Sequence, residues 1–196
     1  MIADDVADRL APWLARWSLS GGAAADVWLG RLALYRFESE QHLLESGEFS
    51  DTLYLLDKGL VRLYYLTPEG RERNKAFYRA GDVTGPLSAA LTGSPAPFSI
   101  QALEPVEAIG FRFADLHEAA AKDTAVARLY SEALAQAFIR NEQREAVLLT
   151  LSAEQRYRWL LDHEPDLPQR VAQYHLASYL GIDPVSLSRL KGKLSC

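Results

Sequence analysis

The stretch that most constrains the fold runs from Gln173 to Lys193 and reads QYHLASYLGIDPVSLSRLKGK. Its apolar spacing suits two short helices that meet across a turn, with Gly181 at the bend. The apolar and small residues of this pattern are Leu176, Ala177, Leu180, Ile182, Leu187 and Leu190. Asp183 is a good N-cap for the second helix, and Pro184 follows at the first helical position, where its missing N–H costs nothing. The stretch therefore predicts a helix-turn-helix.

The outer face of the second predicted helix carries residues suited to contacting DNA. In helix-turn-helix proteins this helix enters the major groove, where an Arg can donate two hydrogen bonds to one guanine. Arg189 is the candidate for that contact, Val185 for a thymine methyl, and Ser188 for a base edge or a phosphate. The complete predicted DNA-binding set is Asp183, Val185, Ser188, Arg189, Lys191 and Lys193. An ordinary helical hairpin that packs on the rest of the protein is the alternative interpretation.

The distribution of charge agrees with a DNA-reading tip on an acidic body. The chain has a net charge of −5, yet from Pro184 onward it holds three basic residues and no acidic one. Because non-specific affinity comes mainly from phosphate neutralisation, an acidic body favours a sequence-selective regulator over a protein that coats DNA.

Length and composition limit the class of protein. A chain of 196 residues that is 48% hydrophobic can bury a core and form one medium domain with a smaller one. No apolar run approaches the ~20 residues needed to span a bilayer, and the acidic start MIADDVADRL does not resemble a secretory signal. We therefore expect a cytoplasmic protein without a membrane partner. Cys196 is the only cysteine, which excludes an intrachain disulfide and a cysteine-rich metal site, and no cofactor is expected.

The first two thirds of the chain change from helical to strand periodicity. Residues Asp5 to Trp17 and Ala24 to Leu32 have helical spacing, whereas Leu34 to about Arg112 breaks into short apolar runs separated by glycine and proline turns. These runs are Leu34 to Phe37, His42 to Leu44, Thr52 to Leu56, Leu60 to Leu66, Asn74 to Tyr78, Phe98 to Ala102 and Ala108 to Phe111. Seven or eight strands at this spacing predict a sandwich or a closed roll.

Within this region the string LLESGEFSDTLYLLDKGLVRLYYLTPEGRERNKAFYRAGDVTGPL resembles the β-roll of the cyclic-nucleotide-binding domain. The order is that of the cyclic AMP receptor protein and FNR (Crp/Fnr) family of bacterial regulators. The matching residues are Gly47-Glu48, Tyr54, Gly59, Gly70, Gly81-Asp82 and Gly85. The resemblance covers about Arg31 to Leu116, and the predicted helix-turn-helix follows at the family's usual distance. It implies double-stranded DNA and RNA polymerase as partners.

After the roll, residues Phe113 to Ala121 read as a short helix and Thr124 to about Leu151 as a long one, with Asp123 as its N-cap. A helix of ~28 residues is ~42 Å long, too long to be buried within one small protein. In the family this helix pairs with its two-fold mate, which implies a homodimer whose recognition helices lie ~34 Å apart over a palindromic site. A monomer that folds the helix back on the roll is the alternative.

The last part of the chain is expected to be a small domain. Ser152 is predicted to cap a helix from Ala153 to Asp162, which Pro165 and Pro168 end, with a hinge near Thr150 to Ser152. The expected α+β fold comprises an N-terminal antiparallel β-roll of jelly-roll type, a long dimerisation helix and a C-terminal, winged-helix-like helix-turn-helix. We place these domains at residues 1–122, 123–151 and 152–196.

The resemblance also identifies where a cyclic nucleotide would bind. In nucleotide-binding members a Gly-Glu-Leu segment holds the ribose and an Arg-Ser-Ala segment grips the phosphate. Here they read Gly85-Pro86-Leu87 and Ala96-Pro97-Phe98, so both polar anchors are replaced and tight binding of cyclic AMP is not expected. The candidates for binding some other small-molecule effector are Arg71, Arg73, Lys75, Gly85 and Leu87. Arg71, Arg73 and Lys75 alternate along one predicted strand and could form an anion site, although a solvated strand face is the favoured explanation.

Catalysis is not expected. An enzyme or a metal-binding barrel of cupin type needs clustered ligands, whereas the histidines are scattered and no glycine-rich phosphate loop or nucleophile elbow is present. The histidines are His42, His117, His163 and His175. A third interpretation is a sensory or scaffolding β-roll with a non-functional DNA face. Many family members carry Glu where this chain has Val185, so we expect its operator to differ from the familiar one.

Overall fold

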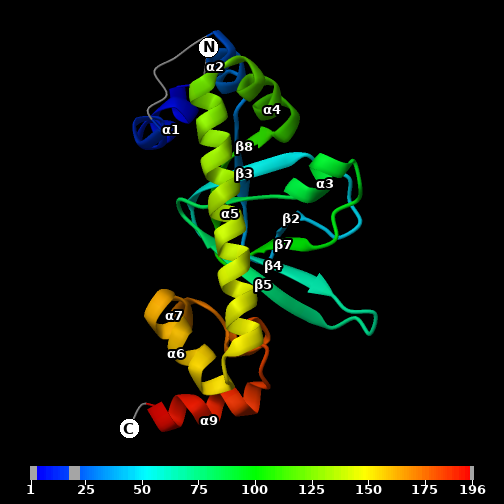
Figure 1. Ribbon diagram of the computed structural model, residues 1–196, viewed down its shortest axis with the longest axis vertical. Coiled ribbons are helices and arrows are strands. Elements are labelled where there is room, and N and C mark those ends of the chain that lie inside the picture. Colours follow the sequence, from blue (N-terminus) through cyan, green and yellow to red (C-terminus); the bar gives the residue numbers. More distant parts are fainter. Residues whose placement is uncertain (1–3, 18–22, 195–196) are drawn as a thin grey trace. The chain divides into compact units, whose positions relative to one another are not determined.

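The computed structural model describes residues 4–17 and 23–194 (Figure 1). The chain forms two compact units. The first comprises Met1–Leu63 with Phe77–Gln136, and the second comprises Tyr64–Ala76 with Ala137–Cys196. A segment from the middle of the predicted roll therefore belongs to the same unit as the C-terminal residues. None of the helices in the described ranges has the length and apolar character required to cross a membrane.

The strands make two four-stranded sheets, as a roll requires. The first has the order β1 (Ala33–Phe37), β8 (Val106–Arg112), β3 (Thr52–Lys58) and β6 (Val83–Thr84), with antiparallel pairing throughout. The second has the order β2 (His42–Leu44), β7 (Ser99–Ala102), β4 (Leu60–Leu66) and β5 (Glu72–Arg79). The predicted α+β class and all seven predicted strands are confirmed. The prediction missed β6 because two residues are too few to show a period.

Helices close one side of the first sheet in the first unit. Figure 1 shows α1 (Asp4–Trp17), α2 (Ala23–Leu29) and α4 (Phe113–Lys122) beside one another. Their buried residues form one core with Leu55 of β3 and Ile109 of β8. The helical members of this core are Val6, Leu10, Ala25, Trp28, Leu29, Leu116, Ala119, Val126 and Leu129. Burial of these side chains explains why the N-terminal sequence has helical periodicity. The second predicted helix was too long, because α2 ends at Leu29.

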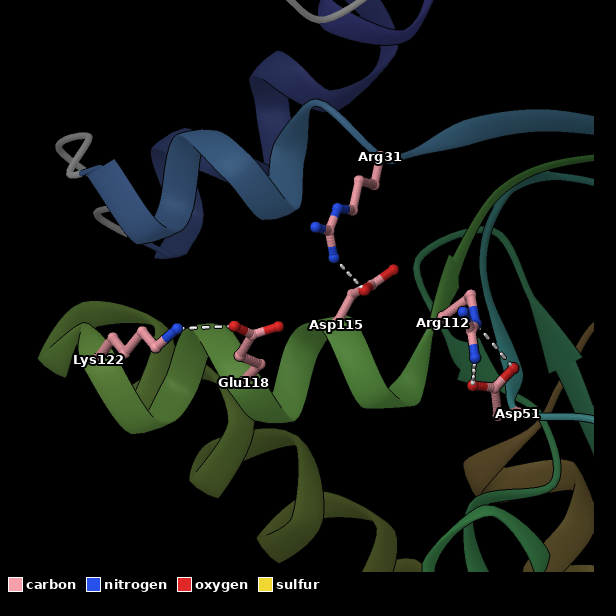
Figure 2. A network of polar contacts seen from close by, with 6 residues as sticks. All are labelled: Arg31, Asp51, Arg112, Asp115, Glu118 and Lys122. Carbon is pink, nitrogen blue, oxygen red and sulfur yellow. Dashed lines mark hydrogen bonds and ion pairs between the residues drawn. The ribbon is translucent and has the colours of Figure 1, made fainter.

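Ion pairs lie near both ends of α4. Arg31, just before β1, pairs with Asp115, and Arg112 contacts Asp51 with its Nη2 3.0 Å from Oδ2 (Figure 2). Lys122 and Glu118 lie one turn apart on α4, with the ammonium 2.6 Å from the carboxylate. Because most of these side chains are exposed, each pair contributes little to the stability of the fold.

The long helix α5 (Thr124–Thr150) begins as predicted. Asp123 Oδ1 accepts hydrogen bonds from the N–H groups of Ala125 at 2.8 Å and Val126 at 3.2 Å. Residues up to Gln136 belong to the first unit, where Val126 and Leu129 are buried. From Ala137 the helix belongs to the second unit, where Val147 is buried.

Four further helices complete the second unit: α6 (Ala153–His163), α7 (Leu167–Arg170), α8 (Gln173–Leu180) and α9 (Pro184–Leu194). The predicted cap of α6 is confirmed, since Ser152 Oγ accepts from the N–H of Gln155 and the Gln155 side chain accepts from the N–H of Ser152. The role predicted for Pro168 was wrong. It lies within the first turn of α7, where proline is compatible with a helix.

The β-structure described in the second unit belongs to the β4–β5 hairpin, with no strand among the described residues of 137–194. Two backbone bonds close the hairpin turn: Thr67 N–H donates to the Arg71 carbonyl, and Gly70 N–H donates to the Thr67 carbonyl, each at 2.9 Å. The helix-turn-helix thus packs with a hairpin from far earlier in the sequence.

Candidate nucleic-acid interface

Helices α8 and α9 form the predicted helix-turn-helix. Leu176, Ala177, Leu180 and Leu187 are completely buried where the two helices meet. Gly181 ends α8 in the left-handed region with φ +63°, a conformation that suits glycine. The N–H of Ile182 then donates to the Ala177 carbonyl at 3.0 Å. The turn is therefore closed by backbone bonds and by an apolar core, as the spacing predicted.

Asp183 begins α9. Its Oδ1 accepts hydrogen bonds from the N–H groups of Val185 at 2.8 Å and Ser186 at 3.4 Å. Gln173 of α8 donates through Nε2 to the Pro184 carbonyl at 3.2 Å, which connects the start of one helix to the start of the other. The predicted N-cap is confirmed, and the start of α9 is fixed from two sides.

Loss of this cap should weaken the second unit. Asp183→Ala is expected to lower the free energy of unfolding by about 1 kcal/mol, because two N–H groups lose their acceptor. Asp183→Asn is the matched control and should unfold nearly as wild type does, since Asn caps equally well. Urea denaturation measures both variants. Equal stability of the Ala and Asn variants would show that the cap contributes nothing.

The outer face of α9 is open to solvent. Val185 is 58% exposed, and Ser188 and Arg189 are also exposed, whereas Lys191 is half-buried. A helix with one buried edge and an exposed row of small, polar and basic side chains has the form needed to enter a DNA groove. The side chain of Asp183 is used in capping α9. A direct contact between Asp183 and DNA remains a prediction.

Lys193 is held by an acidic neighbour. Its Nζ lies 2.8 Å from Oε2 of Glu154 on α6, and Arg158 contacts the other oxygen of the same carboxylate at 2.9 Å. The hydrogen bond from Lys193, together with that from Arg158, lowers the pKa of Glu154. Lys193 must leave Glu154 before it can contact a phosphate.

The β4–β5 hairpin contacts α8 through buried polar groups. Asn74 N–H donates to Ser178 Oγ at 2.9 Å, and its side-chain amide donates to the His175 carbonyl at 3.0 Å. Ser178 Oγ in turn donates to the Glu72 carbonyl at 3.2 Å. Asn74 and His175 are both buried. The first helix of the helix-turn-helix is thereby bonded to a hairpin that begins in the roll.

Arg144 of α5 joins the same contact. Its Nε donates to the Lys75 carbonyl at 3.4 Å, and its guanidinium carbon lies 4.0 Å from the centroid of the Tyr179 ring. Burial lowers the pKa of Arg144. This cation–π contact links α5 and α8 within the second unit.

The candidate effector residues fall in different units. Arg73 and Lys75 lie on β5 in the second unit, whereas Gly85 and Leu87 belong to the first unit. Arg71 precedes β5, so the prediction that it lies on that strand was wrong. Arg73 is exposed and Lys75 Nζ lies 5.9 Å from the centroid of the Tyr65 ring, as expected for a solvated strand face.

The two segments that align with the nucleotide-binding segments of the family offer no free polar group at Pro86 or at the backbone N–H of Ala96. Pro86 precedes the short helix α3 (Leu87–Thr92) and offers no side-chain cap. Ala96 N–H donates to the Glu48 carbonyl, and the Ala96 carbonyl accepts from Gly47 N–H, both at 2.8 Å. The backbone donor at the expected phosphate position therefore already has an acceptor.

The roll also buries a charged side chain that the sequence analysis missed. Arg62 of β4 is 4% exposed and donates from Nε at 2.8 Å and from Nη2 at 2.6 Å to Gln101 Oε1. The position of Arg62 within the apolar run Leu60 to Leu66 could have indicated that this side chain is buried. Among the described residues no cluster of three His, Cys, Asp or Glu side chains could hold a metal ion.

Other contacts were invisible to sequence reasoning because their partners lie far apart in the chain. Asn74 and Ser178 are 104 residues apart, and although each lies in a predicted element, nothing in either pattern pairs the two. Arg156 of α6 was also missed, although it donates to three carbonyl groups around the helix-turn-helix.

Comparison with known proteins agrees with this architecture. Residues 34–123 match the cyclic nucleotide-binding domain family. A 64-residue segment is 38% identical to the fumarate and nitrate reduction regulatory protein of Vibrio cholerae, and this match covers 33% of the chain and 25% of that curated relative.

Similar solved structures extend over most of the chain. FixK2 from Bradyrhizobium japonicum has a TM-score of 0.72 at 23% identity, covering 84% of both chains. The catabolite activator protein of Thermus thermophilus has a TM-score of 0.54 at 24% identity, covering 91% of this chain and 86% of that one. A proposed transcriptional regulator of the Crp/Fnr family from Eubacterium rectale has a TM-score of 0.70 at 18% identity, covering 89% and 83%. At these identities the structural likeness shows the fold.

Proposed function

We propose that this chain is a homodimeric transcription regulator of the Crp/Fnr type that reads a two-fold symmetric DNA site with α9, a proposal that its similarity to the cyclic nucleotide-binding domain family and to Crp/Fnr structures supports. One observation carries the proposal: α9 is fixed through buried Leu187 and capped by Asp183, while Val185, Ser188 and Arg189 are left exposed. Such a helix presents a guanine-reading group, an apolar contact for thymine and a hydroxyl on one face. In this function the protein acts in the cytoplasm, and RNA polymerase is its proposed protein partner.

The second half of α5 supports the dimer. Phe138 is 62% exposed, Ile139 is 44% exposed and Leu149 is 75% exposed. Phe138 and Leu149 are separated by about three helical turns and lie on the same face of the helix. Glu142 and Glu145, both exposed, lie between them on that face, and Ile139 lies about 100° away around the axis. Large apolar side chains exposed to water favour burial against a second copy, and a two-fold pair would present two recognition helices to the same side of a duplex.

Binding to DNA should depend on salt. Equilibrium titrations of fluorescent duplexes are expected to show affinity falling steeply between about 50 and 200 mM salt, because each phosphate contact releases counterions. Salt-independent binding, or no binding at all, would contradict the proposed function. It would favour the second candidate, a sensory or scaffolding roll, which the pairing of Lys193 with Glu154 supports.

Cyclic AMP is not the proposed effector. We expect millimolar cyclic AMP to leave the melting temperature unchanged, because Pro86 and Ala96 offer no side chain for ribose or phosphate. A ligand present at 100 times its Kd would stabilise the fold by about 2.7 kcal/mol, a shift that differential scanning fluorimetry readily detects. A clear stabilisation by cyclic AMP would show that these two positions do not decide nucleotide binding.

A further inference from the structure

Arg156 of α6 connects the ends of two other helices. Its Nη2 donates to the Leu148 carbonyl at 2.7 Å, and its Nε donates to the Leu151 carbonyl at 2.9 Å. Its Nη1 donates to the Leu180 carbonyl at 3.0 Å. Leu148 lies in the last turn of α5, Leu180 is the last residue of α8, and Leu151 lies in the connection between α5 and α6. One guanidinium thus bridges α5, the connection and the helix-turn-helix.

Two of these acceptors, the carbonyls of Leu148 and Leu180, lie in the last turn of a helix and need a donor from outside that helix. The last four carbonyls of a helix have no partner within the helix, and they carry the negative end of its dipole. A planar guanidinium with donors in a fixed fork can satisfy carbonyls on two helices at once, which the single point charge of lysine cannot do. The bonds also have a charged donor, which makes them stronger than ordinary amide bonds.

The bend of the helix-turn-helix is closely packed against the same group. A Cβ atom placed on Gly181 would lie 3.2 Å from Nη1 of Arg156 and 3.4 Å from Cδ2 of Leu148. Gly181 therefore lets the bend approach both the guanidinium and the end of α5.

We propose that Arg156 is a positioning residue that locks the helix-turn-helix to the C-terminal end of α5. The connection at Leu151–Ser152 is then a fixed joint, whereas the sequence analysis placed a hinge there. The inference rests on the proposed function for its consequence: in a dimer paired through α5, a fixed joint sets the separation of the two recognition helices. Arg156 thereby decides which spacing between operator half-sites the protein accepts.

The DNA test uses the full-length protein and the palindromic duplex that wild type selects from a random pool. In a series of variants of this duplex, one to four base pairs are added to, or removed from, the spacer between the two half-sites. Wild type should bind one spacing strongly and reject the others. Arg156→Gln should lose about tenfold at the best spacing, as expected for loss of bonds from a charged donor, and should lose much less at the other spacings. The affinity of Arg156→Lys at the best spacing should lie between those of wild type and Arg156→Gln. Base preference within each half-site should stay unchanged, which separates positioning from direct DNA contact.

Arg158→Gln is the matched control. It removes the same charge from the same helix and leaves the three carbonyl bonds of Arg156 in place. Arg158 contacts Glu154, which also pairs with Lys193, so a change in affinity should be equal at all spacings and the spacing profile should remain that of wild type. An Arg156→Gln protein that melts cooperatively and keeps the narrow spacing profile would overturn the proposal. If Arg156→Gln does not fold, the same spacing measurement is made on Arg156→Lys. A wild-type spacing profile in Arg156→Lys would then overturn the proposal.

A second readout does not depend on DNA. Hydrogen exchange of the peptide covering residues 148–156 should be at least about tenfold faster in Arg156→Gln than in wild type or Arg158→Gln, because local opening follows the lost contacts. Unchanged exchange would overturn the lock even if the proposed function holds. Faster exchange in a protein that binds no duplex would support the lock and contradict the proposed function instead.

Discussion

Phe138→Glu is expected to turn the dimer into a monomer and to weaken binding to a palindromic duplex about 100-fold or more, because the two half-sites are then no longer bound by linked recognition helices. Phe138 is 62% exposed on α5, and Leu149 lies on the same face. A carboxylate at this position would have to be buried against its two-fold mate, where like charges repel and lose water. Sedimentation velocity measures the change in mass, and equilibrium titration measures the change in affinity.

Gln143→Glu is the matched control for this variant. Gln143 is exposed on the same helix but lies about 140° around its axis from Phe138. The control introduces the same carboxylate on another face and should remain dimeric with nearly wild-type affinity. A dimeric Phe138→Glu protein would show that this face of α5 is not the interface. If wild type itself sediments as a single chain, the result would favour the alternative that the protein is a monomer.

Arg189→Ala is expected to cost about 1 to 3 kcal/mol per half-site and to relax preference at one base pair in each half-site, because a bidentate contact to one base is lost. Arg189 is exposed on the outer face of α9, next to Ser188 and one turn after Val185. Competition titrations against duplexes with single substitutions at each position measure both effects. The variant should melt as wild type does, since an exposed arginine contributes little to the fold.

Lys191→Ala provides the contrast for Arg189→Ala. A lysine that contacts phosphate should weaken all sequences alike and reduce the slope of log affinity against log salt by about one. If Arg189→Ala weakens all sequences equally and keeps every base preference, Arg189 contacts the backbone, and another residue of α9 reads the base.

Local sequence signals were sufficient for the elements and for the helix-turn-helix. Strand periodicity marked every strand except β6, and caps at Asp123, Ser152 and Asp183 marked helix starts because an N-cap acts within three residues. Side-chain spacing also placed Leu187 inside and Arg189 outside on α9. These features depend on neighbours in the chain, and this is why they could be predicted.

The contacts that hold the candidate interface in place could not be predicted in the same way. Asn74 and His175 meet across 101 residues, and Arg156 reaches backbone carbonyls, which have no side-chain signature. A periodic pattern shows which face of an element is buried but not which distant element covers it. The assignment of Tyr64–Ala76, which includes the turn of the β4–β5 hairpin, to the unit of the helix-turn-helix therefore emerged only from the structure.

Selection of duplexes from a random pool tests the central claim most directly. The purified full-length protein should enrich a site with two-fold symmetry, whose half-site centres are about one DNA turn, ~34 Å, apart, and Arg189→Ala should enrich the same site with one position per half-site relaxed. Equal recovery of all duplexes, or enrichment of a single asymmetric site by wild type, would contradict the assignment of α9 as a paired recognition helix.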